Sequence, residues 1–243
     1  RTLEPAIESV GLANVSVIDP TCGSGHFLLG AFERLWQRWS DAEPAMAADL
    51  RAAKALDAVW GVDINPFAAA IARFRLLVAA MQHGGQRRLA DVKGYPIHVA
   101  VGDSLLWGAA QQSLPGMEGA GGADDQFLYA TEDANALRDT FERRFSAVVG
   151  NPPYIVPKDK AANAAYRKLY GSCSGKFSLG VPFTELFFNL AEPANPATAK
   201  RAGFVGMITA NSFMKREFGG KLITDFIPNW DLTHVVDTSG AYI

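Results

Sequence analysis

The sequence predicts an α/β fold with a mostly parallel central sheet and helices on both faces. Short apolar runs alternate with longer segments of helical period along the 243 residues, which is typical of parallel sheets joined by helices. With 49% hydrophobic and 20% charged residues, the chain has the composition of a globular domain. We expect residues 1–243 to form one domain that is incomplete at both ends, since the sequence starts at Arg1 without a Met and stops abruptly at Ile243.

The expected strands are short apolar runs, most of which end in a polar residue or a turn signal. Their length suits strands that are buried between two layers of helices. In chain order they are Val15–Asp19, Ala58–Asp63, Ile97–Asp103, Phe145–Gly150, Gly203–Thr209 and Leu232–Asp237.

The expected helices carry apolar residues at spacings of three and four. Pro66 suits the first turn of one of them, because the first turn leaves its N–H groups unused. These helices are Gly25–Trp39, Pro44–Leu56, Pro66–Gln82, Asp133–Arg144, Pro182–Leu190 and Ser212–Phe226. By contrast, Gly108–Gly122 has no clear period, and we expect a flexible insertion over about residues 108–125.

Several classes of protein are excluded by what the sequence lacks. It has no run of about 18 apolar residues, so we expect no contact with a membrane, and its start lacks the apolar core of a signal peptide. Cys22 and Cys173 lie far apart, and with the four His they form no zinc spacing, so we expect no metal site. Two separate cysteines fit a reducing cytoplasm best.

The net charge of −2 hides an asymmetry. Residues 1–150 carry 13 basic and 18 acidic side chains, whereas residues 151–243 carry 10 basic and 7 acidic ones. Basic residues interleaved with aromatic ones suit a phosphate backbone with exposed bases, although a solvated helix is the simpler interpretation of each lysine alone. The interleaved residues are Tyr154, Lys158, Lys160, Tyr166, Arg167, Lys168, Tyr170 and Lys176.

Asn151-Pro152-Pro153-Tyr154 is the most informative segment. It follows the expected strand 145–150, and two adjacent prolines cannot continue a sheet because neither offers an N–H. The strand must therefore end in a stiff loop at its carboxyl edge, where open α/β sheets bind ligands. Asn151 offers that ligand polar groups for hydrogen bonds, and Tyr154 offers an aromatic ring on which a planar ligand can stack.

A glycine-rich loop follows the first expected strand. Its glycines allow a tight turn and a close approach of backbone to a ligand. The dinucleotide fingerprint fits poorly, because Leu28 replaces its third glycine and Asp63 lies 40 residues after Gly23 instead of about 20. The loop and the helix start that follows are Asp19-Pro20-Thr21-Cys22-Gly23-Ser24-Gly25-His26-Phe27.

Polar residues also follow the next two expected strands. Asp63 can accept hydrogen bonds from ribose hydroxyls, Ile64 can pack on an adenine face, and Asp103, which precedes Ser104, can accept from an adenine amino group. For one Asp alone, a helix N-cap is an equally good interpretation. Four successive strand ends with polar residues nevertheless indicate one ligand site.

These motifs resemble those of N6-adenine DNA methyltransferases that use S-adenosylmethionine. The segment 19–25 is similar to their first motif, Asp63 and Asp103 to their second and third, and Asn-Pro-Pro-Tyr to their fourth. Thr184-Glu185-Leu186-Phe187 is similar to the helix motif that follows. The resemblance implies a Rossmann-like class I methyltransferase fold. It also implies a cofactor site of Asp19, Thr21, Cys22, Gly23, Gly25, Phe27, Asp63, Ile64, Asp103, Ser104 and Asn151.

A narrower resemblance is to the large methyltransferases of BREX phage-defence systems (PglX-like) and to type IIG restriction–modification enzymes. It is carried by the segments 175–183 and 208–214. It implies marking of host DNA, with defence-system subunits as possible partners. Target recognition on double-stranded DNA would need regions beyond this chain.

The resemblance implies direct methyl transfer to N6 of a flipped adenine. Asn151 and the Pro152 carbonyl would grip the amino group, Pro153 would keep the loop rigid and Tyr154 would stack on the base. A glutamine amide of a protein or an RNA base offers the same NH₂ group, so both remain alternatives. A non-catalytic module that binds DNA or a partner and keeps a relic cofactor pocket is a third alternative.

Overall fold

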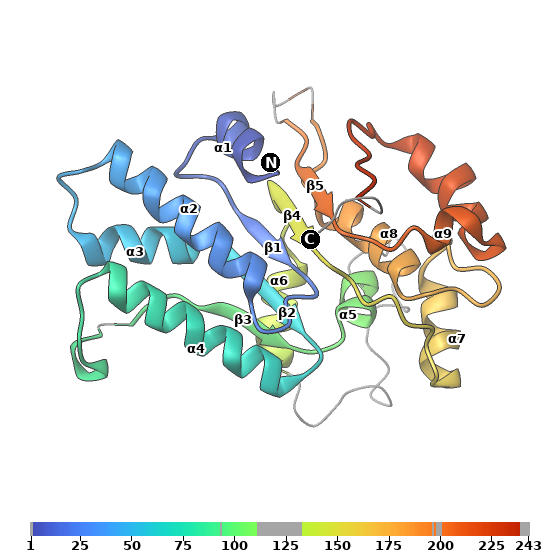
Figure 1. Ribbon diagram of the computed structural model, residues 1–243, viewed down its shortest axis with the longest axis horizontal. Coiled ribbons are helices and arrows are strands. Elements are labelled where there is room, and N and C mark those ends of the chain that lie inside the picture. The colour runs from blue at the N-terminus through green and yellow to red at the C-terminus, as the bar shows by residue number, and fades with distance from the viewer. Residues whose placement is uncertain (1, 93, 111–132, 196, 198–200, 239–243) are drawn as a thin grey trace.

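The computed structural model describes residues 2–92, 94–110, 133–195, 197 and 201–238. Five parallel strands form one sheet in the order β3-β2-β1-β4-β5 (Figure 1). The order reverses between β1 and β4, and such a switch point is where open α/β sheets bind ligands. The strands are β1 (Val17–Asp19), β2 (Val59–Asp63), β3 (His98–Val101), β4 (Ala147–Gly150) and β5 (Phe204–Met207).

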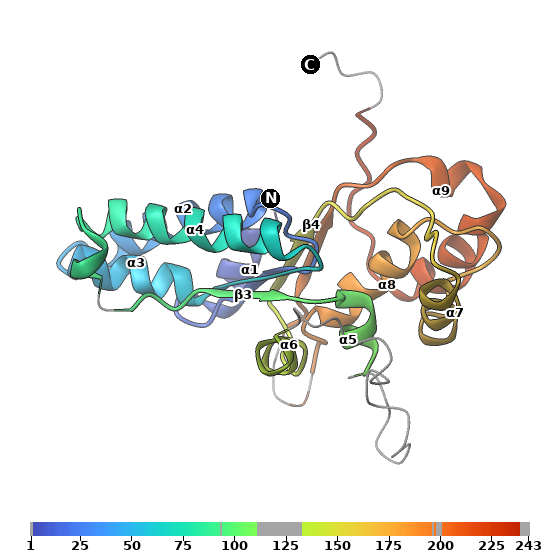
Figure 2. The ribbon, with the colours of Figure 1, turned by 90° about the horizontal axis from the view of Figure 1, so that it is seen from below.

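Helices cover both faces of the sheet, as Figure 2 shows. Alternate strand residues point to opposite faces, so Val17 and Val59 join one buried cluster while Ile18 and Val62 join the other. The first face holds α1 (Leu3–Val10), α2 (His26–Ala42), α3 (Ala48–Asp57) and α4 (Pro66–His83). The second holds α5 (Ser104–Ala110), α6 (Ala134–Phe141), α7 (Lys160–Leu169) and α8 (Gly180–Leu190). The predicted fold class is confirmed.

Two predicted elements near residue 243 are wrong. The helix expected over 212–226 ends early as α9 (Ser212–Lys215), because Arg216 is extended and Gly219 packs against the Phe213 carbonyl, where a Cβ would lie 1.9 Å from its oxygen. Short 3-10 and π turns replace the rest up to Asn229. Residues 232–237 form no strand in the described structure, and Val235 and Val236 are 66% and 64% exposed. An outer strand needs a neighbour, and no described segment pairs with this one.

Three helices of the described residues were not predicted from the sequence: α1, α5 and α7. The Asp159 side chain begins α7 by accepting from the Ala161 and Ala162 N–H groups at 2.7 and 3.4 Å. Residues 108–110 belong to α5, so the predicted insertion is wrong for these three residues. Most of it, residues 111–125, lies outside the described residues.

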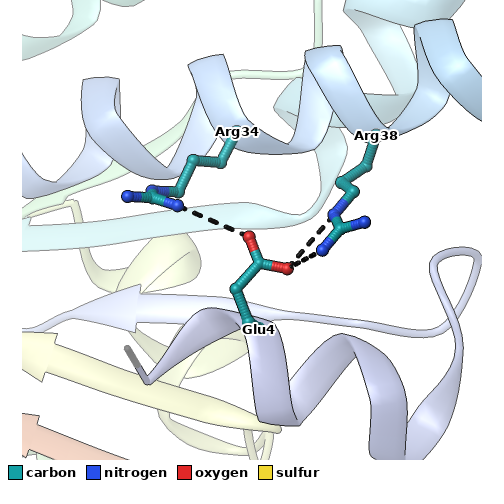
Figure 3. A network of polar contacts seen from close by, with 3 residues as sticks. All are labelled: Glu4, Arg34 and Arg38. Atoms are coloured by element: carbon teal, nitrogen blue, oxygen red, sulfur yellow. Dashed lines mark hydrogen bonds and ion pairs between the residues drawn. The ribbon is translucent and has the colours of Figure 1, made fainter.

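The carboxylate of Glu4 links α1 to α2. Glu4 accepts hydrogen bonds from Arg34 and Arg38, which lie one turn apart on α2 (Figure 3). The hydrogen bond and charge of Arg38, together with those of Arg34, lower the pKa of Glu4. The two arginine side chains are exposed and Glu4 is partly exposed, so each pair contributes at most about 1 kcal/mol. The network therefore orients α1 more than it stabilises the domain.

Candidate active site

The glycine-rich loop after β1 has the tight backbone that its sequence predicts. Gly23 and Gly25 have φ of 54° and 84°, in the left-handed region that side chains disfavour. A Cβ on Gly25 would lie 3.0 Å from the Ala72 Cβ of α4. The loop therefore lets α2 begin directly at the carboxyl edge of the sheet, close against α4.

Asp63 joins this loop to the end of β2. Its Oδ2 accepts from the Gly23 N–H at 2.8 Å, and its Oδ1 accepts from the Asn65 N–H at 2.8 Å. The structure thus brings together two predicted site residues that lie 40 positions apart. An ionised carboxylate has about four acceptor sites, so Asp63 keeps capacity for a ligand. Ile64 beside it is 52% exposed, as a residue that packs on a ligand must be.

Asp19 is the last residue of β1 and lies deeper in the structure, at 1% exposure. Its Oδ1 accepts from the Thr21 N–H at 2.8 Å and the Thr21 hydroxyl at 3.0 Å. Burial raises the pKa of Asp19 to about 7, and the nearby charge of Asp63 adds to the rise against the two Thr21 hydrogen bonds. Gly150 permits this packing, because a Cβ there would lie 2.6 Å from Asp19 Oδ1 and 2.8 Å from the Phe187 ring.

Asp103 and Ser104 are also packed into the structure. Asp103 Oδ1 accepts from the Leu105 and Leu106 N–H groups at 2.9 and 3.2 Å, which is the N-cap arrangement, while Oδ2 accepts from the Tyr166 hydroxyl at 2.5 Å. The Ser104 hydroxyl donates to the Pro20 carbonyl at 2.7 Å. The two residues therefore fix the end of β3 against the loop after β1.

The Asn-Pro-Pro-Tyr segment leaves the sheet at the end of β4. Pro152 is buried, whereas Asn151, Pro153 and Tyr154 are exposed. The Tyr154 hydroxyl donates to Asn151 Oδ1, and desolvation raises the pKa of that hydroxyl. The Ile155 carbonyl accepts from the Leu179 N–H at 2.8 Å, which anchors the loop to the start of α8. Asn151 is therefore an exposed residue on an anchored loop, and its carbonyl oxygen accepts from Tyr154.

Two other predicted site residues are placed differently. Cys22 is 5% exposed and packs against Gly61, and burial raises the pKa of its thiol, so its side chain is part of the packing beneath the glycine-rich loop. Phe27 is half-buried and lines a pocket of about 350 Å³ together with His26, Val149 and Ile208. That pocket does not include Asp63 or Asp103, so Phe27 faces the β4–β5 side of the loop.

Tyr166 and Phe187 are site residues that the sequence did not single out for these roles. Phe187 belongs to the Thr-Glu-Leu-Phe segment, which was the available signal. Tyr166 was grouped with the aromatics for stacking on bases. That interpretation is wrong for Tyr166 and Tyr170, which are 7% and 0% exposed and belong to the core. Of the three interleaved tyrosines, Tyr154 is the exposed one, at 44%, and its stacking role stays a prediction.

Among the described residues, no helix is both long and apolar enough to cross a bilayer. The same residues contain no group of three His, Cys, Asp or Glu side chains that could hold a metal ion.

Two family models match the sequence. The model of the Eco57I restriction-modification methylase matches residues 57–243, and that of the MmeI DNA-methyltransferase domain matches residues 8–98. Together they span the loop after β1 and the Asn-Pro-Pro-Tyr segment.

Two longer methyltransferases resemble the chain over nearly its whole length. It is 52% identical to the adenine-specific methyltransferase PglX of Streptomyces coelicolor, over 100% of this chain and 21% of the relative. It is 24% identical to the type II methyltransferase M.BstVI of Geobacillus stearothermophilus, over 93% of this chain and 34% of that relative. The chain therefore spans about a fifth to a third of these two proteins.

Solved structures share the fold at low sequence identity. The type ISP restriction-modification enzyme LlaBIII bound to DNA superposes with a TM-score of 0.56 at 16% identity, over 87% of this chain and 14% of that enzyme. The DrdV–DNA complex gives a TM-score of 0.55 at 13% identity, over 89% and 20% of the two chains. At this identity the likeness concerns the fold.

Proposed function

We propose, from the premise that this chain belongs to the Eco57I restriction-modification methylase family, that the full-length protein methylates N6 of adenine in double-stranded DNA. The observation that carries the proposal is the exposed Asn151 amide on the held loop after β4, beside the switch point of the sheet. The adenine-specific name of the 52% identical relative favours adenine over a protein glutamine. As the BREX resemblance implies, we assign the reaction to host DNA marking.

The residues at the ends of β1 to β3 fit S-adenosylmethionine. Gly23 and Gly25 leave no side chain between the backbone and a ligand, and Asp63 has spare acceptor sites for ribose hydroxyls. Asp19 and Asp103 lie on the same edge of the sheet, and Asp19, once it ionises above about pH 7, adds negative charge that favours a cationic ligand. Thr21, Cys22 and Ser104 shape this cradle through their packing. When bound, S-adenosylmethionine supplies a methyl group on a positively charged sulfur.

The loop after β4 fits the amino group of a base that has been flipped out of the duplex. Asn151 Oδ1 and the Pro152 carbonyl accept its two N–H bonds, which orients the nitrogen lone pair by positioning and fixed dipoles. The Tyr154 hydroxyl donates to Asn151 Oδ1 in the structure, and release of this bond frees both the tyrosine ring and the full acceptor capacity of the amide oxygen. The freed ring can then stack on the base, a contact of about 1–3 kcal/mol.

The test is methyl transfer by the full-length protein with labelled S-adenosylmethionine and duplex DNA. We expect label in N6-methyladenine. Asn151→Ala should abolish transfer while cofactor affinity, measured by calorimetry, stays within about twofold. Tyr154→Phe should retain most activity because the ring remains, whereas Tyr154→Ala should lose it. Label that enters RNA or a protein glutamine, and not DNA, contradicts the proposal.

A further inference from the structure

A basic groove lies on α7, a few residues beyond the Asn-Pro-Pro-Tyr segment. It has a volume of about 510 Å³, and its lining includes Pro157, Lys158, Lys160, Asn163, Arg167 and Lys168. All four cationic side chains are exposed. The opposite side of α7 is held in the core by Tyr166, so the helix presents one charged face to solvent from a fixed position.

Internal contacts fix the shape of the groove without neutralising it. Arg167 donates to the Gly175 carbonyl at 2.6 Å and lies over the Phe177 ring, 5.2 Å from its centroid. The Asp159 carboxylate is engaged in capping α7. Within the part of the chain that the structure describes, Lys158, Lys160 and Lys168 form no ion pair with any carboxylate. Three unpaired lysines around one groove favour a polyanion.

The groove begins three residues after the Asn-Pro-Pro-Tyr segment of the candidate active site. Tyr154, Ile155 and Val156 connect the two and are 44%, 63% and 46% exposed. The four residue-to-residue steps from Tyr154 to Lys158 span at most about 14 Å, even when fully extended. In a nucleotide, the sugar lies between the base and the phosphate. In the same way, the apolar residues 154–156 lie along the chain between the residues proposed to bind the amino group and the cationic groove.

We propose that this basic groove binds the phosphate backbone of the DNA strand next to the flipped adenine, with Lys158, Lys160 and Lys168 as phosphate contacts. The inference rests on the proposed DNA methylation and names the surface that positions the strand. Arg167 is a positioning residue for the wall of the groove, since its guanidinium is bound to the segment 175–177.

The experiment measures binding of the full-length protein to duplex DNA over a range of salt concentrations. Each phosphate contact contributes about 0.9 to the slope of log K against log salt. The variant Lys158→Gln/Lys160→Gln/Lys168→Gln should therefore reduce the slope by up to about 2.7, on specific and non-specific DNA alike. The charge-preserving variant Lys158→Arg/Lys160→Arg/Lys168→Arg should retain most of it. Cofactor affinity, measured by calorimetry, should stay unchanged in both, which verifies folding.

Arg87→Gln/Arg88→Gln is the matched control. Both arginines are exposed and follow the end of α4, which lies at the opposite end of the molecule from α7 (Figures 1 and 2). This variant should keep the wild-type slope. A wild-type slope in the triple Gln variant, with normal methylation by the wild-type protein, overturns the groove and leaves the proposed function intact. Absence of DNA binding and methylation in the wild-type protein overturns both. Loss of RNA or acidic-polypeptide binding, with DNA binding unchanged, also overturns the groove assignment.

Discussion

The Tyr166 hydroxyl donates to the Asp103 carboxylate at 2.5 Å and joins α7 to the end of β3 across 63 residues of sequence. Both side chains are buried, at 7% and 4% exposure. The helix that carries the basic groove is thus held by a carboxylate of the candidate cofactor site. One bond connects the two surfaces that the proposed reaction must align.

Tyr166→Phe should therefore affect cofactor binding as well as stability. Loss of a buried hydrogen bond to a charged group should reduce the free energy of unfolding by about 1–3 kcal/mol. Without that bond Asp103 is less fixed, and we expect a several-fold weaker affinity for S-adenosylmethionine by calorimetry. Tyr170→Phe is the control, because its buried hydroxyl donates to the Leu105 carbonyl at 2.7 Å and not to Asp103. Equal affinity losses in the two variants would show that the effect is merely structural.

Asp63→Ala should weaken cofactor binding by about tenfold or more. The change removes the proposed ribose acceptor and also the bond that fixes Gly23. Asp57→Ala is the matched control, since Asp57 lies at the other end of β2 and its carboxylate is bound to His98 at 2.9 Å. Calorimetry on both variants separates the two positions. Wild-type affinity in Asp63→Ala would remove Asp63 from the cofactor site.

The polar residues at the strand ends could be predicted from the sequence, because a strand that stops at Pro, Gly or Asp leaves a local signal. Asp63 and Gly23 are placed together by the parallel register of β1 and β2, which the βαβ pattern implies. Their partners could not be predicted in this way. Whether Tyr166 faces solvent or Asp103 depends on how α7 packs, and the basic residues around it favoured an exposed tyrosine.

The errors near residue 243 have a different cause. Residues 232–237 have the apolar composition of a strand, yet a strand forms only with a neighbour to bond with. Local pattern predicts the tendency to form a strand and not the presence of a partner. Similarly, Arg216 and Gly219 interrupt the helix expected over 212–226, where the apolar period alone favoured continuation.

Gly150→Ala should destabilise the domain, although alanine has no polar or bulky group. Its Cβ would lie 2.6 Å from Asp19 Oδ1, 2.8 Å from Phe187 and 2.9 Å from the Thr21 hydroxyl. Overpacking of this kind costs about 1–3 kcal/mol. Gly30→Ala is the control, because no atom lies within 4 Å of its added Cβ and alanine favours the helix by up to about 1 kcal/mol. Chemical denaturation should therefore give shifts of opposite sign, and a neutral Gly150→Ala would contradict the close packing of β1 and β4.

Asp19 should make stability depend on pH between about 4 and 7. Its pKa is about 7 in the folded protein, mainly because it is buried, against 3.8 for an unperturbed carboxyl. Between these values the folded state binds more protons than the unfolded state, so the free energy of unfolding falls as the pH rises. The full difference corresponds to about 4 kcal/mol. Asp19→Asn keeps an oxygen for the Thr21 N–H and removes the titration.

Denaturation of both proteins at several pH values measures this effect. The stability of the wild type relative to Asp19→Asn should be highest near pH 4 and should decline until about pH 7, above which the two curves run parallel. Asp139→Asn, at an exposed carboxylate on α6, serves as the control and should show no such decline. Because the negative charge of Asp19 favours a cationic ligand, Asp19→Asn should also weaken S-adenosylmethionine binding above pH 7 more than at pH 5. Parallel stability curves from pH 4 to 7 would mean that Asp19 stays ionised in the folded protein.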